Sequence, residues 1–350
     1  MKYYDWNKTL SYDADVTMVV GARGIGKTYG LRKQFINDYI KKGSRFVELT
    51  RHQKQLPDFT SSYFARMVTN EEFPDYVFKT TNKLAYIAEK TEKPKWEICG
   101  YFGAMTAAQD MKKQTFANVK RILLDEAIID KRIDRYHRYL ANEYSVLANI
   151  VDSVSRERPE TPNALRPRIY LLGNACDLLN PYFGVYGIGE EPKIGYSWHD
   201  GKNMLLHYIK DDVYATAKSE DTVAGRMLNN TLDGMVANSN EFIRQSKDFV
   251  VKKPKRAKFN FGLVYLDRKY GIWVDEQEGY YYVTRKIPKN TSNPIFALTA
   301  SDNKVNYIAA RKAELALKGF TDLYYLGIVR YEDSLVKGEF IEILTLFGVR

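Results

Sequence analysis

Short apolar runs alternate with segments of helical periodicity along residues 16–175. The runs are rich in β-branched and aliphatic residues, as is typical of buried strands; they are VTMVV (16–20), RFVELT (45–50), RILLDEA (121–127) and RIYLLGNA (168–175). Apolar residues recur at helical spacing from Thr28 to Lys42, where Gly43 supplies a stop, and again along residues 142–154. This alternation predicts an α/β fold with a mostly parallel sheet and helices on both of its faces.

Departures from this alternation predict how the chain divides into domains. Residues 75–89 and 96–102 have the pattern of a small antiparallel excursion from the sheet. Residues 208–252 are polar and helix-prone, whereas residues 259–285 have the pattern of three antiparallel strands joined by tight turns. We therefore expect an α/β domain over residues 1–207, a small helical linker domain over residues 208–252 and an α+β domain over residues 253–350.

The composition narrows the class of protein. Hydrophobic residues make up 45% of the 350 residues and charged residues 27%, which is the balance of a folded globular chain. No apolar run approaches the ~18 residues of a membrane span, and no apolar segment typical of a secretory signal is present, so we expect a cytoplasmic protein without membrane contact. Cys99, Cys176 and the four histidines show no zinc-site spacing. The net charge of +10 favours contact with polyanions.

Residues 21–28, GARGIGKT, match the phosphate-binding pattern G-x-x-x-x-G-K-[ST] without a mismatch and lie between a predicted strand and a predicted helix. The glycines permit positive φ angles and a close approach of backbone N–H groups to phosphate. Lys27 can reach the β- and γ-phosphates, the Thr28 hydroxyl can bind Mg²⁺, and the helix points its positive end at the anion. We expect a nucleotide to contact the whole loop: Gly21, Ala22, Arg23, Gly24, Ile25, Gly26, Lys27 and Thr28.

The second half of this site is expected where the run at residues 121–127 ends in two acids. Asp125 is placed to hold Mg²⁺ and Glu126 to orient and deprotonate the attacking water; the alternative is a strand end whose acids are merely solvated. Asn174 ends the neighbouring predicted strand and either senses the γ-phosphate or forms an ordinary turn. The sequence NACD (174–177) lacks the lysine of the guanine motif N-K-x-D, so ATP is the expected nucleotide.

Two arginines leave a further choice open. Arg156 and Arg158 lie in SRERPETP (155–162), where an amphipathic helix ends before Pro159. Arginines at a helix terminus are commonly solvated or interact with the helix dipole. In ring-shaped ATPases such an arginine instead reaches the γ-phosphate bound by the neighbouring subunit, which accelerates hydrolysis by about 10³–10⁵.

Beyond these motifs, long stretches of the sequence resemble one family. GARGIGKT, LLDE (123–126) and DSVSRER…YLLGNACDLLNPYF (152–183) are similar to the genome-packaging ATPases of small, protein-primed tailed phages, in the FtsK/HerA-like branch of ring translocases. LSYD (10–13), EFPDY (72–76) and YGIWVDEQEGYYYV (270–283) extend the resemblance over most of the chain.

The resemblance implies a P-loop NTPase fold with an additional catalytic glutamate. It also implies a pentameric ring at the portal vertex of a procapsid, which drives double-stranded DNA inward with ATP and Mg²⁺, with a structural packaging RNA in some members. Such a protein acts in the host cytoplasm, docks transiently on the procapsid and is not expected in the mature virion.

The resemblance repeats the roles of the P-loop and of the two acids, and it adds residues to the site. Arg156 becomes the arginine finger that acts on the neighbouring subunit, with Arg158 as the fallback. Lys112 matches a lysine thought to act across the subunit interface, and Arg51 matches an arginine near the nucleotide. For Lys112 and Arg51, a merely solvated side chain is the alternative.

For residues 253–350 the resemblance implies an RNase H-like domain, related to the nuclease of large terminases but without its activity. The acids here lie in predicted turns rather than converging on paired metals; they are Asp267, Asp275, Glu276 and Glu278. We expect this domain to bind nucleic acid, including RNA, or the portal, and the basic run KKPKRAK (252–258) to contact phosphates or to form a solvated hinge. The alternatives to a packaging motor are a large terminase with nuclease activity, a cellular DNA pump or helicase loader, and a nucleotide-binding scaffold without turnover.

Overall fold

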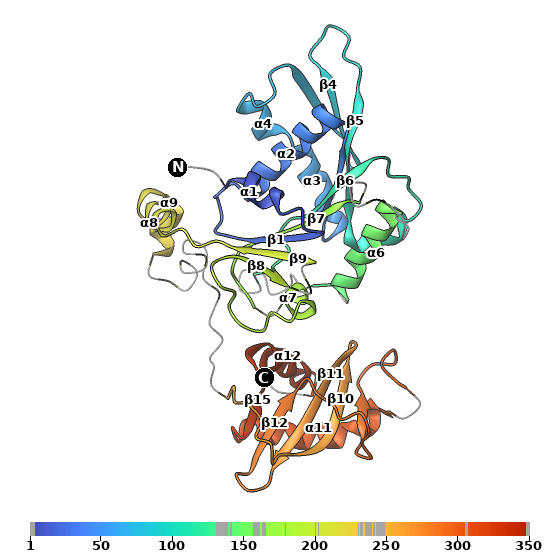
Figure 1. Cartoon of the computed structure of the whole chain (residues 1–350), viewed down its shortest axis with the longest axis vertical. Coiled ribbons are helices and arrows are strands. Elements are labelled where there is room, and N and C mark those ends of the chain that lie inside the picture. Colours follow the sequence, from blue (N-terminus) through green and yellow to red (C-terminus); the bar gives the residue numbers. More distant parts are fainter. Residues whose placement is uncertain are drawn as a thin grey trace. The chain divides into compact units, whose positions relative to one another are not determined.

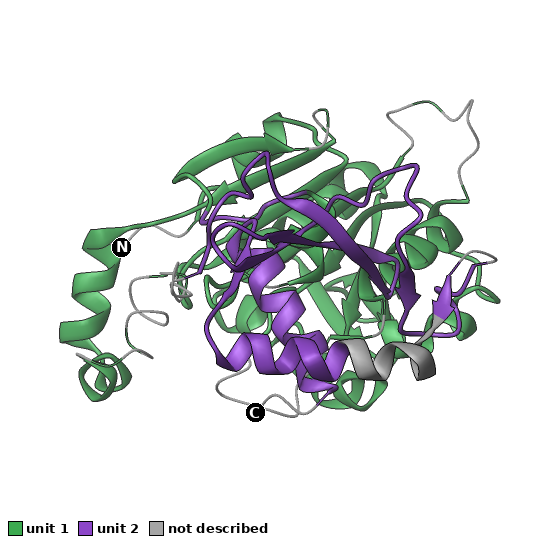
Figure 2. Cartoon of the chain, turned by 90° about the horizontal axis from the view of Figure 1, so that it is seen from below, with its two compact units in different colours: residues 1–186, 192–243 green, residues 187–191, 244–350 purple. Residues whose placement is uncertain are grey.

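The computed structural model of the chain describes residues 4–130, 139–140, 142–156, 162, 166–178, 180–199, 201, 203–229, 231, 234, 240, 242, 249–304 and 307–347. The chain divides into two compact units, coloured separately in Figure 2: unit 1 comprises residues 1–186 and 192–243, and unit 2 comprises residues 187–191 and 244–350. Each unit has its own sheet and its own hydrophobic core. None of the described helices combines the length and the apolar character that crossing a bilayer requires.

The described strands of unit 1 form a nine-stranded sheet in the order β3-β4-β5-β2-β6-β7-β1-β9-β8 (Figure 1). They are β1 (Val16–Val20), β2 (Arg45–Thr50), β3 (Tyr76–Thr80), β4 (Leu84–Glu89), β5 (Glu97–Ala104), β6 (Val119–Leu124), β7 (Arg168–Gly173), β8 (Gly195–His199) and β9 (Met204–Tyr208). From β5 to β9 all neighbours pair in parallel, and the antiparallel pairs lie at the two edges. The predicted mostly parallel sheet is confirmed. The predicted antiparallel excursion consists of β3, β4 and β5. Its last strand, β5, also pairs in parallel with β2 and so joins the excursion to the parallel sheet.

Helices cover both faces of this sheet (Figure 1). The helices and 3₁₀ turns of unit 1 are α1 (Trp6–Ser11), α2 (Lys27–Lys42), η1 (Gln53–Gln55), α3 (Leu56–Ser61), α4 (Ala65–Thr69), η2 (Met105–Ala107), α5 (Ala108–Met111), α6 (Glu143–Ser155), α7 (Pro181–Val185), α8 (Asp212–Asp221) and α9 (Val223–Leu228). Along β7, Tyr170 and Leu172 belong to the core beneath α2, whereas Ile169 and Leu171 face α6, because successive residues of a strand point to opposite faces.

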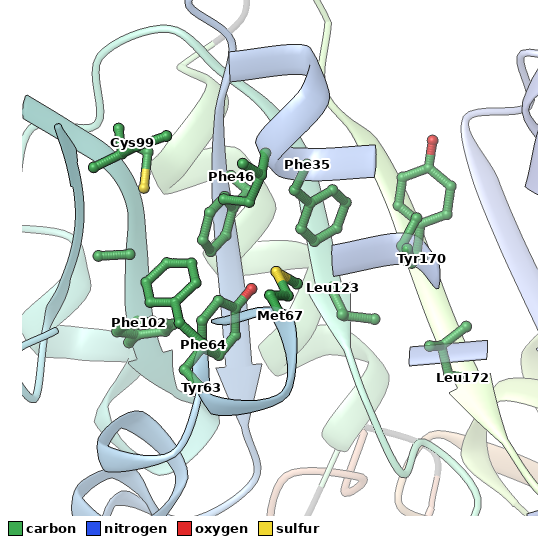
Figure 3. Packing of buried hydrophobic residues seen from close by; sticks show 14 of the residues in the cluster. Phe35, Phe46, Tyr63, Phe64, Met67, Cys99, Phe102, Leu123, Tyr170 and Leu172 are labelled. Atoms are coloured by element: carbon green, nitrogen blue, oxygen red, sulfur yellow. The ribbon is translucent and has the colours of Figure 1, made fainter. Parts of the chain in front are cut away.

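The core between α2 and the sheet is built largely from aromatic rings (Figure 3). Phe35 of α2 stacks on Phe46 of β2 with ring centroids 5.2 Å apart, and Phe46 stacks in turn on Tyr63 at 5.7 Å. As predicted, α2 ends at Gly43, whose φ of 63° closes the last turn. Each fully buried side chain of this size contributes ~1.5–3 kcal/mol, so this core fixes the direction in which α2 leaves the loop that precedes it.

The described strands of unit 2 form a six-stranded sheet in the order β14-β13-β10-β11-β12-β15. The elements are β10 (Lys258–Tyr265), β11 (Arg268–Asp275), β12 (Tyr280–Thr284), β13 (Ile295–Ala297), β14 (Ile308–Ala309), α11 (Ala310–Tyr325), β15 (Val329–Tyr331) and α12 (Ser334–Thr345). β10, β11 and β12 are antiparallel neighbours, as the sequence predicted, and the other described strands add in parallel. Helices α8 and α9 belong to unit 1, so a separate linker domain over residues 208–252 stays a prediction.

Candidate nucleotide-binding site

The loop at residues 21–26 joins the end of β1 to the start of α2. Gly24 and Gly26 adopt φ angles of 93° and 85°, in the region that glycine reaches without a steric penalty. Gly26 is the N-cap of α2, a helix of 16 residues whose first N–H groups and positive dipole end therefore face the loop. This is the local conformation that the sequence GARGIGKT predicted.

Lys27 places its ammonium group inside the curve of this loop. The Lys27 Nζ donates to the carbonyl oxygens of Gly21 at 2.6 Å and Ala22 at 2.9 Å, and to the Asn174 Oδ1 at 3.2 Å. Burial lowers the pKa of Lys27 to about 8, although the Asp125 carboxylate acts in the opposite direction. Asn174 thus lies beside the phosphate-binding loop, as the sequence predicted. A phosphate bound in the loop would take the place of the three oxygen atoms that now accept from the Lys27 ammonium.

Thr28 and Asp125 meet one residue further along α2. The Thr28 hydroxyl donates to the Asp125 Oδ2 at 2.9 Å, although the two residues are 97 positions apart in the sequence. Asp125 follows β6, which is separated from β1 by β7 alone. A hydroxyl and a carboxylate at hydrogen-bond distance are oxygen ligands of the kind that Mg²⁺ prefers, so the pair fits the metal position that the sequence predicted.

Glu126 has an exposed side chain and an unusual backbone. Its φ of 52° is in the left-handed region, which costs a residue with a side chain of the order of 1 kcal/mol or more. Its N–H donates to the Asp125 Oδ1 at 2.9 Å, and the following N–H, of Ala127, donates to the carbonyl oxygen of Leu172 at 2.7 Å. A cavity of about 230 Å³ opens beside Glu126. It is also lined by Arg32, Glu48, Leu49, Thr50, Arg51, Gln55, Phe59 and Asp125.

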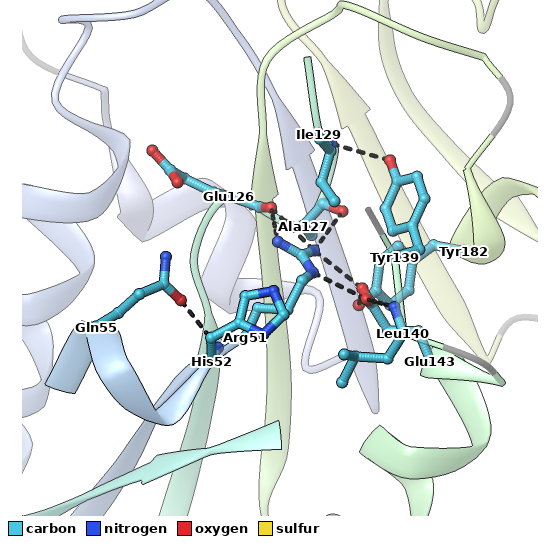
Figure 4. A network of polar contacts seen from close by, with 10 residues as sticks. All are labelled: Arg51, His52, Gln55, Glu126, Ala127, Ile129, Tyr139, Leu140, Glu143 and Tyr182. Carbon is cyan, nitrogen blue, oxygen red and sulfur yellow. Dashed lines mark hydrogen bonds and ion pairs between the residues drawn. The ribbon is translucent and has the colours of Figure 1, made fainter. Parts of the chain in front are cut away.

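The Arg51 side chain contacts the backbone of the loop that carries Glu126 (Figure 4). The guanidinium is 5% exposed and donates to both carboxylate oxygens of Glu143, at 2.8 and 2.9 Å. It also donates to the carbonyl oxygens of Glu126 and Ala127, each at 3.2 Å. The buried Glu143 carboxylate further accepts from the Tyr182 hydroxyl at 2.7 Å. The Arg51 guanidinium therefore contacts the backbone of the loop that carries Glu126. Its predicted contact with nucleotide stays a prediction.

Arg156 ends α6, the helix that Glu143 begins. At its first residue, Glu143, α6 is joined through Arg51 to the loop that carries Glu126. A helix of 13 residues spans about 20 Å, so Arg156 lies about that far along α6 from the Glu126 loop of the same chain. The exposed Arg156 guanidinium donates to the carbonyl oxygen of Gln114 at 3.0 Å. Lys112, also exposed, precedes Gln114 by two residues, so the structure brings these two predicted trans-acting residues into one region. Arg158 lies outside the described residues.

Sequence motifs did not mark the N-terminal residues that brace the P-loop. The Tyr4 N–H donates to the carbonyl oxygen of Ile25 at 2.8 Å, and the buried Trp6 indole donates to the carbonyl oxygen of Lys27, also at 2.8 Å. A Cβ at Gly30 would lie 2.8 Å from the Trp6 ring. The sequence signal was therefore a glycine inside a predicted helix, where glycine costs about 1 kcal/mol unless another group needs the space.

A buried ion pair one turn into α2 also escaped the sequence analysis. The Arg32 Nη2 lies 2.6 Å from the Glu48 Oε1, and the Glu48 side chain is fully buried on β2. The Arg32 guanidinium lies over the Tyr63 ring, 4.6 Å from its centroid. Arg32 and Thr28 are four residues apart and share a face of the helix, so the two contacts together fasten α2 across β6 and β2.

Comparison with known proteins identifies the family. The model of the podovirus DNA encapsidation protein (Gp16) family matches residues 1–345. The chain belongs to this family. The DNA packaging protein of Bacillus phage phi29 is 30% identical over 337 residues, which cover 96% of this chain and 95% of that protein. The DNA packaging protein of Bacillus phage B103 is 30% identical over 330 residues, which cover 94% and 96% of the two chains.

Solved structures of this Gp16 family agree with the fold. A chain of the bacteriophage phi29 genome packaging motor assembly superposes with a TM-score of 0.72 at 26% identity and covers 99% of this chain and 100% of its own length. The N-terminal domain of the phi29 DNA packaging ATPase superposes with a TM-score of 0.50 at 30% identity, over 59% of this chain and 96% of the domain. The resemblance to phage packaging ATPases and the predicted P-loop α/β fold are confirmed, as is the general function in phage DNA packaging. Membership of this family also argues against a cellular DNA pump or helicase loader.

Proposed function

We propose that copies of this chain form a ring that hydrolyses ATP and uses the energy to drive double-stranded DNA into a procapsid. The observation that carries the proposal is the meeting of Lys27 with Asn174 and of Thr28 with Asp125 at one edge of the parallel sheet. A cradle for phosphates, a metal position and an acid beside them are the parts that phosphoryl transfer to water requires.

The cradle holds the triphosphate through the loop N–H groups, the start of α2 and the Lys27 ammonium. Thr28 and Asp125 would hold Mg²⁺, which bridges phosphate oxygens and neutralises charge that develops during hydrolysis. Asn174 is placed to contact the γ-phosphate or the attacking water, because it already lies at 3.2 Å from the Lys27 Nζ.

Glu126 acts as the general base. Its side chain is exposed, whereas its backbone is held in place by Asp125 at the N–H and by Arg51 at the carbonyl oxygen. A carboxylate on a fixed backbone can orient a water molecule for attack on the γ-phosphate and accept its proton. Arg51 is best understood as a positioning residue for this carboxylate.

The finger comes from the neighbouring subunit. Because Arg156 lies about 20 Å along α6 from the loop of its own Glu126, its guanidinium is better placed to reach a phosphate bound by another copy. Lys112 lies in the same region and would act at the same interface, with Arg158 as the alternative finger. A closed ring, for which we propose a pentamer, gives every subunit one complete site.

Unit 2 supplies contacts rather than cleavage. Three of the four acids noted in the sequence are engaged by cations: Asp275 and Glu278 pair with Arg256, and Glu276 pairs with Lys258 at 2.7 Å. The Arg256 guanidinium lies 2.8 Å from the Asp275 Oδ2 and holds the pKa of Asp275 below its usual range. A cation thus already occupies the carboxylate that paired metals would need.

The same ion pairs occupy part of the basic run 252–258, and Lys253 lies over the Trp273 ring at 4.3 Å. The run therefore offers fewer cations to phosphate than its sequence suggests, and we assign it mainly a structural role. The proposed partners of the chain are double-stranded DNA, the portal, the procapsid and a structural packaging RNA. It would act in the host cytoplasm, transiently on the procapsid.

A packaging assay tests the proposal. Procapsids with portals, linear labelled double-stranded DNA, ATP and Mg²⁺ are combined with the purified chain, and DNA that resists added nuclease is measured. Wild-type protein should protect full-length DNA, whereas Lys27→Ala and Glu126→Gln should protect none. The control variants Lys42→Ala and Glu89→Gln, which make the same changes at exposed positions outside the site, should protect DNA as the wild type does. Protection by Glu126→Gln would refute the assigned base.

Two further arms separate the alternatives. Ribonuclease added before assembly, to procapsids isolated with their bound RNA, should prevent protection if a packaging RNA takes part. Supercoiled plasmid incubated with the chain and Mg²⁺ or Mn²⁺ should stay intact; cleavage would establish a terminase-like nuclease in place of the inactive domain proposed here.

A further inference from the structure

Within unit 1, helix α8 contacts the P-loop at the carbonyl oxygen of Arg23. The Tyr214 hydroxyl donates to the carbonyl oxygen of Arg23 at 2.7 Å, and the Lys218 Nζ donates to the same oxygen at 3.1 Å. Tyr214 and Lys218 are four residues apart, so their side chains share one face of the helix. The two contacts join positions 191 and 195 residues apart in the sequence, and none of the phosphate-binding signatures includes them.

Gly24 shows that the loop and α8 are fitted to each other. The signature G-x-x-x-x-G-K leaves this position free, yet the residue here is glycine with a φ of 93°. A Cβ at Gly24 would lie only 2.3 Å from the Tyr214 hydroxyl oxygen. Glycine therefore serves the backbone conformation and also makes room for Tyr214.

Three cations converge on this loop. The Lys27 ammonium lies inside its curve, Arg23 belongs to it and Lys218 approaches it from α8. The charges of Arg23 and Lys218 both act to lower the pKa of Lys27. Burial and the charge of Arg23 likewise lower the pKa of Lys218. Like charges held together repel one another, and a bound polyphosphate would turn this repulsion into attraction.

We propose that Lys218 is a nucleotide-binding residue, whose ammonium leaves the Arg23 carbonyl oxygen for a phosphate oxygen when a nucleoside di- or triphosphate binds. The inference rests on the proposed function, because it uses the same phosphate cradle. Tyr214 keeps α8 against the loop while Lys218 changes its acceptor. The nucleotide is then held in part by α8, and its loss loosens that helix from the P-loop.

The test is nucleotide affinity, measured by titration calorimetry without DNA. Lys218→Ala should weaken binding of ATP and ADP about tenfold, equivalent to about 1.4 kcal/mol, because a charge-assisted hydrogen bond to phosphate is lost. The affinity for adenosine, measured by competition, should stay unchanged. Lys218→Arg should restore most of the affinity, and Lys42→Ala, which removes an exposed charge at the far end of α2, should leave it intact.

Two outcomes would overturn the inference. One is an unchanged ATP affinity in Lys218→Ala. The other is an equal loss for ATP, ADP and adenosine, which would indicate a structural change rather than a lost phosphate contact; circular dichroism and the melting temperature without nucleotide check this independently. Lys27→Ala separates the inference from the proposed function. If Lys27→Ala also left ATP affinity unchanged, the cradle itself would be wrong, whereas a failure of Lys218→Ala alone would remove only α8 from the site.

Discussion

Arg51→Met separates a residue that positions the catalytic loop from one that contacts nucleotide. Methionine retains much of the side-chain volume but removes the guanidinium shared by Glu143 and two carbonyl oxygens of the loop. Glu143 is only 1% exposed, and it keeps the Tyr182 hydroxyl and the Leu140 N–H as donors at 2.7 and 2.9 Å. The substitution therefore leaves a buried carboxylate that is partly satisfied.

Removing one partner of a buried ion pair costs about 3–5 kcal/mol. The two remaining donors place the expected loss of unfolding free energy at the lower end, about 3 kcal/mol. The double variant Arg51→Met/Glu143→Gln removes the stranded charge and keeps an amide that can bond the Leu140 N–H and the Tyr182 hydroxyl, so it should be more stable than the single variant by about 1–2 kcal/mol. In both variants the carbonyl oxygen of Glu126 loses its donor, the Arg51 guanidinium. Both variants should therefore hydrolyse ATP slowly.

The assay combines urea unfolding with hydrogen exchange, because a chain with two units need not unfold in one step. Faster exchange should be confined to peptides from residues 121–129 and 142–155. In steady-state kinetics, Arg51→Met should lower kcat and leave the affinity for ATP nearly unchanged. Arg45→Met is the matched control, since Arg45 begins β2, the strand that Arg51 follows, and donates instead to the Tyr101 hydroxyl at 3.1 Å.

A full kcat with weakened ATP binding in Arg51→Met would refute this reasoning and make Arg51 a nucleotide ligand, as the sequence resemblance suggested. A double variant less stable than the single one would refute the assumption that Glu143 is stranded.

The other predictions concern the finger, the cradle and its brace. Arg156→Ala should abolish phosphate release, and rings mixed with Lys27→Ala should regain part of it, because finger and cradle come from different chains; no recovery would return Arg156 to a solvated role. ATP affinity should fall about tenfold per pH unit above pH 8, because the pKa of Lys27 is about 8 in the free protein and phosphate binds its protonated form. Calorimetry in two buffers should show the proton uptake, and Lys27→Arg should flatten the dependence. Trp6→Phe removes the N–H donor to the Lys27 carbonyl oxygen and should cost about 1 kcal/mol in urea unfolding; an unchanged midpoint would refute the brace.

The parts of the site predicted from sequence are those that depend on short segments. GARGIGKT fixes its own loop because its glycine positions and the following helix determine local backbone geometry. Asp125 and Glu126 were found because an apolar run ending in two acids indicates a strand tip. The parallel sheet then brings that tip to the P-loop, where Thr28 meets Asp125.

The parts that were missed depend on contacts between distant segments. Glu143 is 92 residues from Arg51, and Lys218 is 195 residues from Arg23. From the sequence, Arg51 was expected either near the nucleotide or solvated, because charged residues are rarely buried without a partner and its partner, Glu143, lies on α6. For the same reason the sequence could not show that Arg256 pairs with Asp275, the last residue of β11, and that Lys258 pairs with Glu276 after it.

The central claim is that nucleotide is hydrolysed between neighbouring subunits and that this hydrolysis is coupled to DNA. The most direct test measures ATP turnover with and without double-stranded DNA, on protein whose mass is determined by light scattering in the same solution. Turnover should rise with assembly into rings and again when DNA is added. Full turnover by an isolated monomer, unaffected by DNA, would contradict the claim.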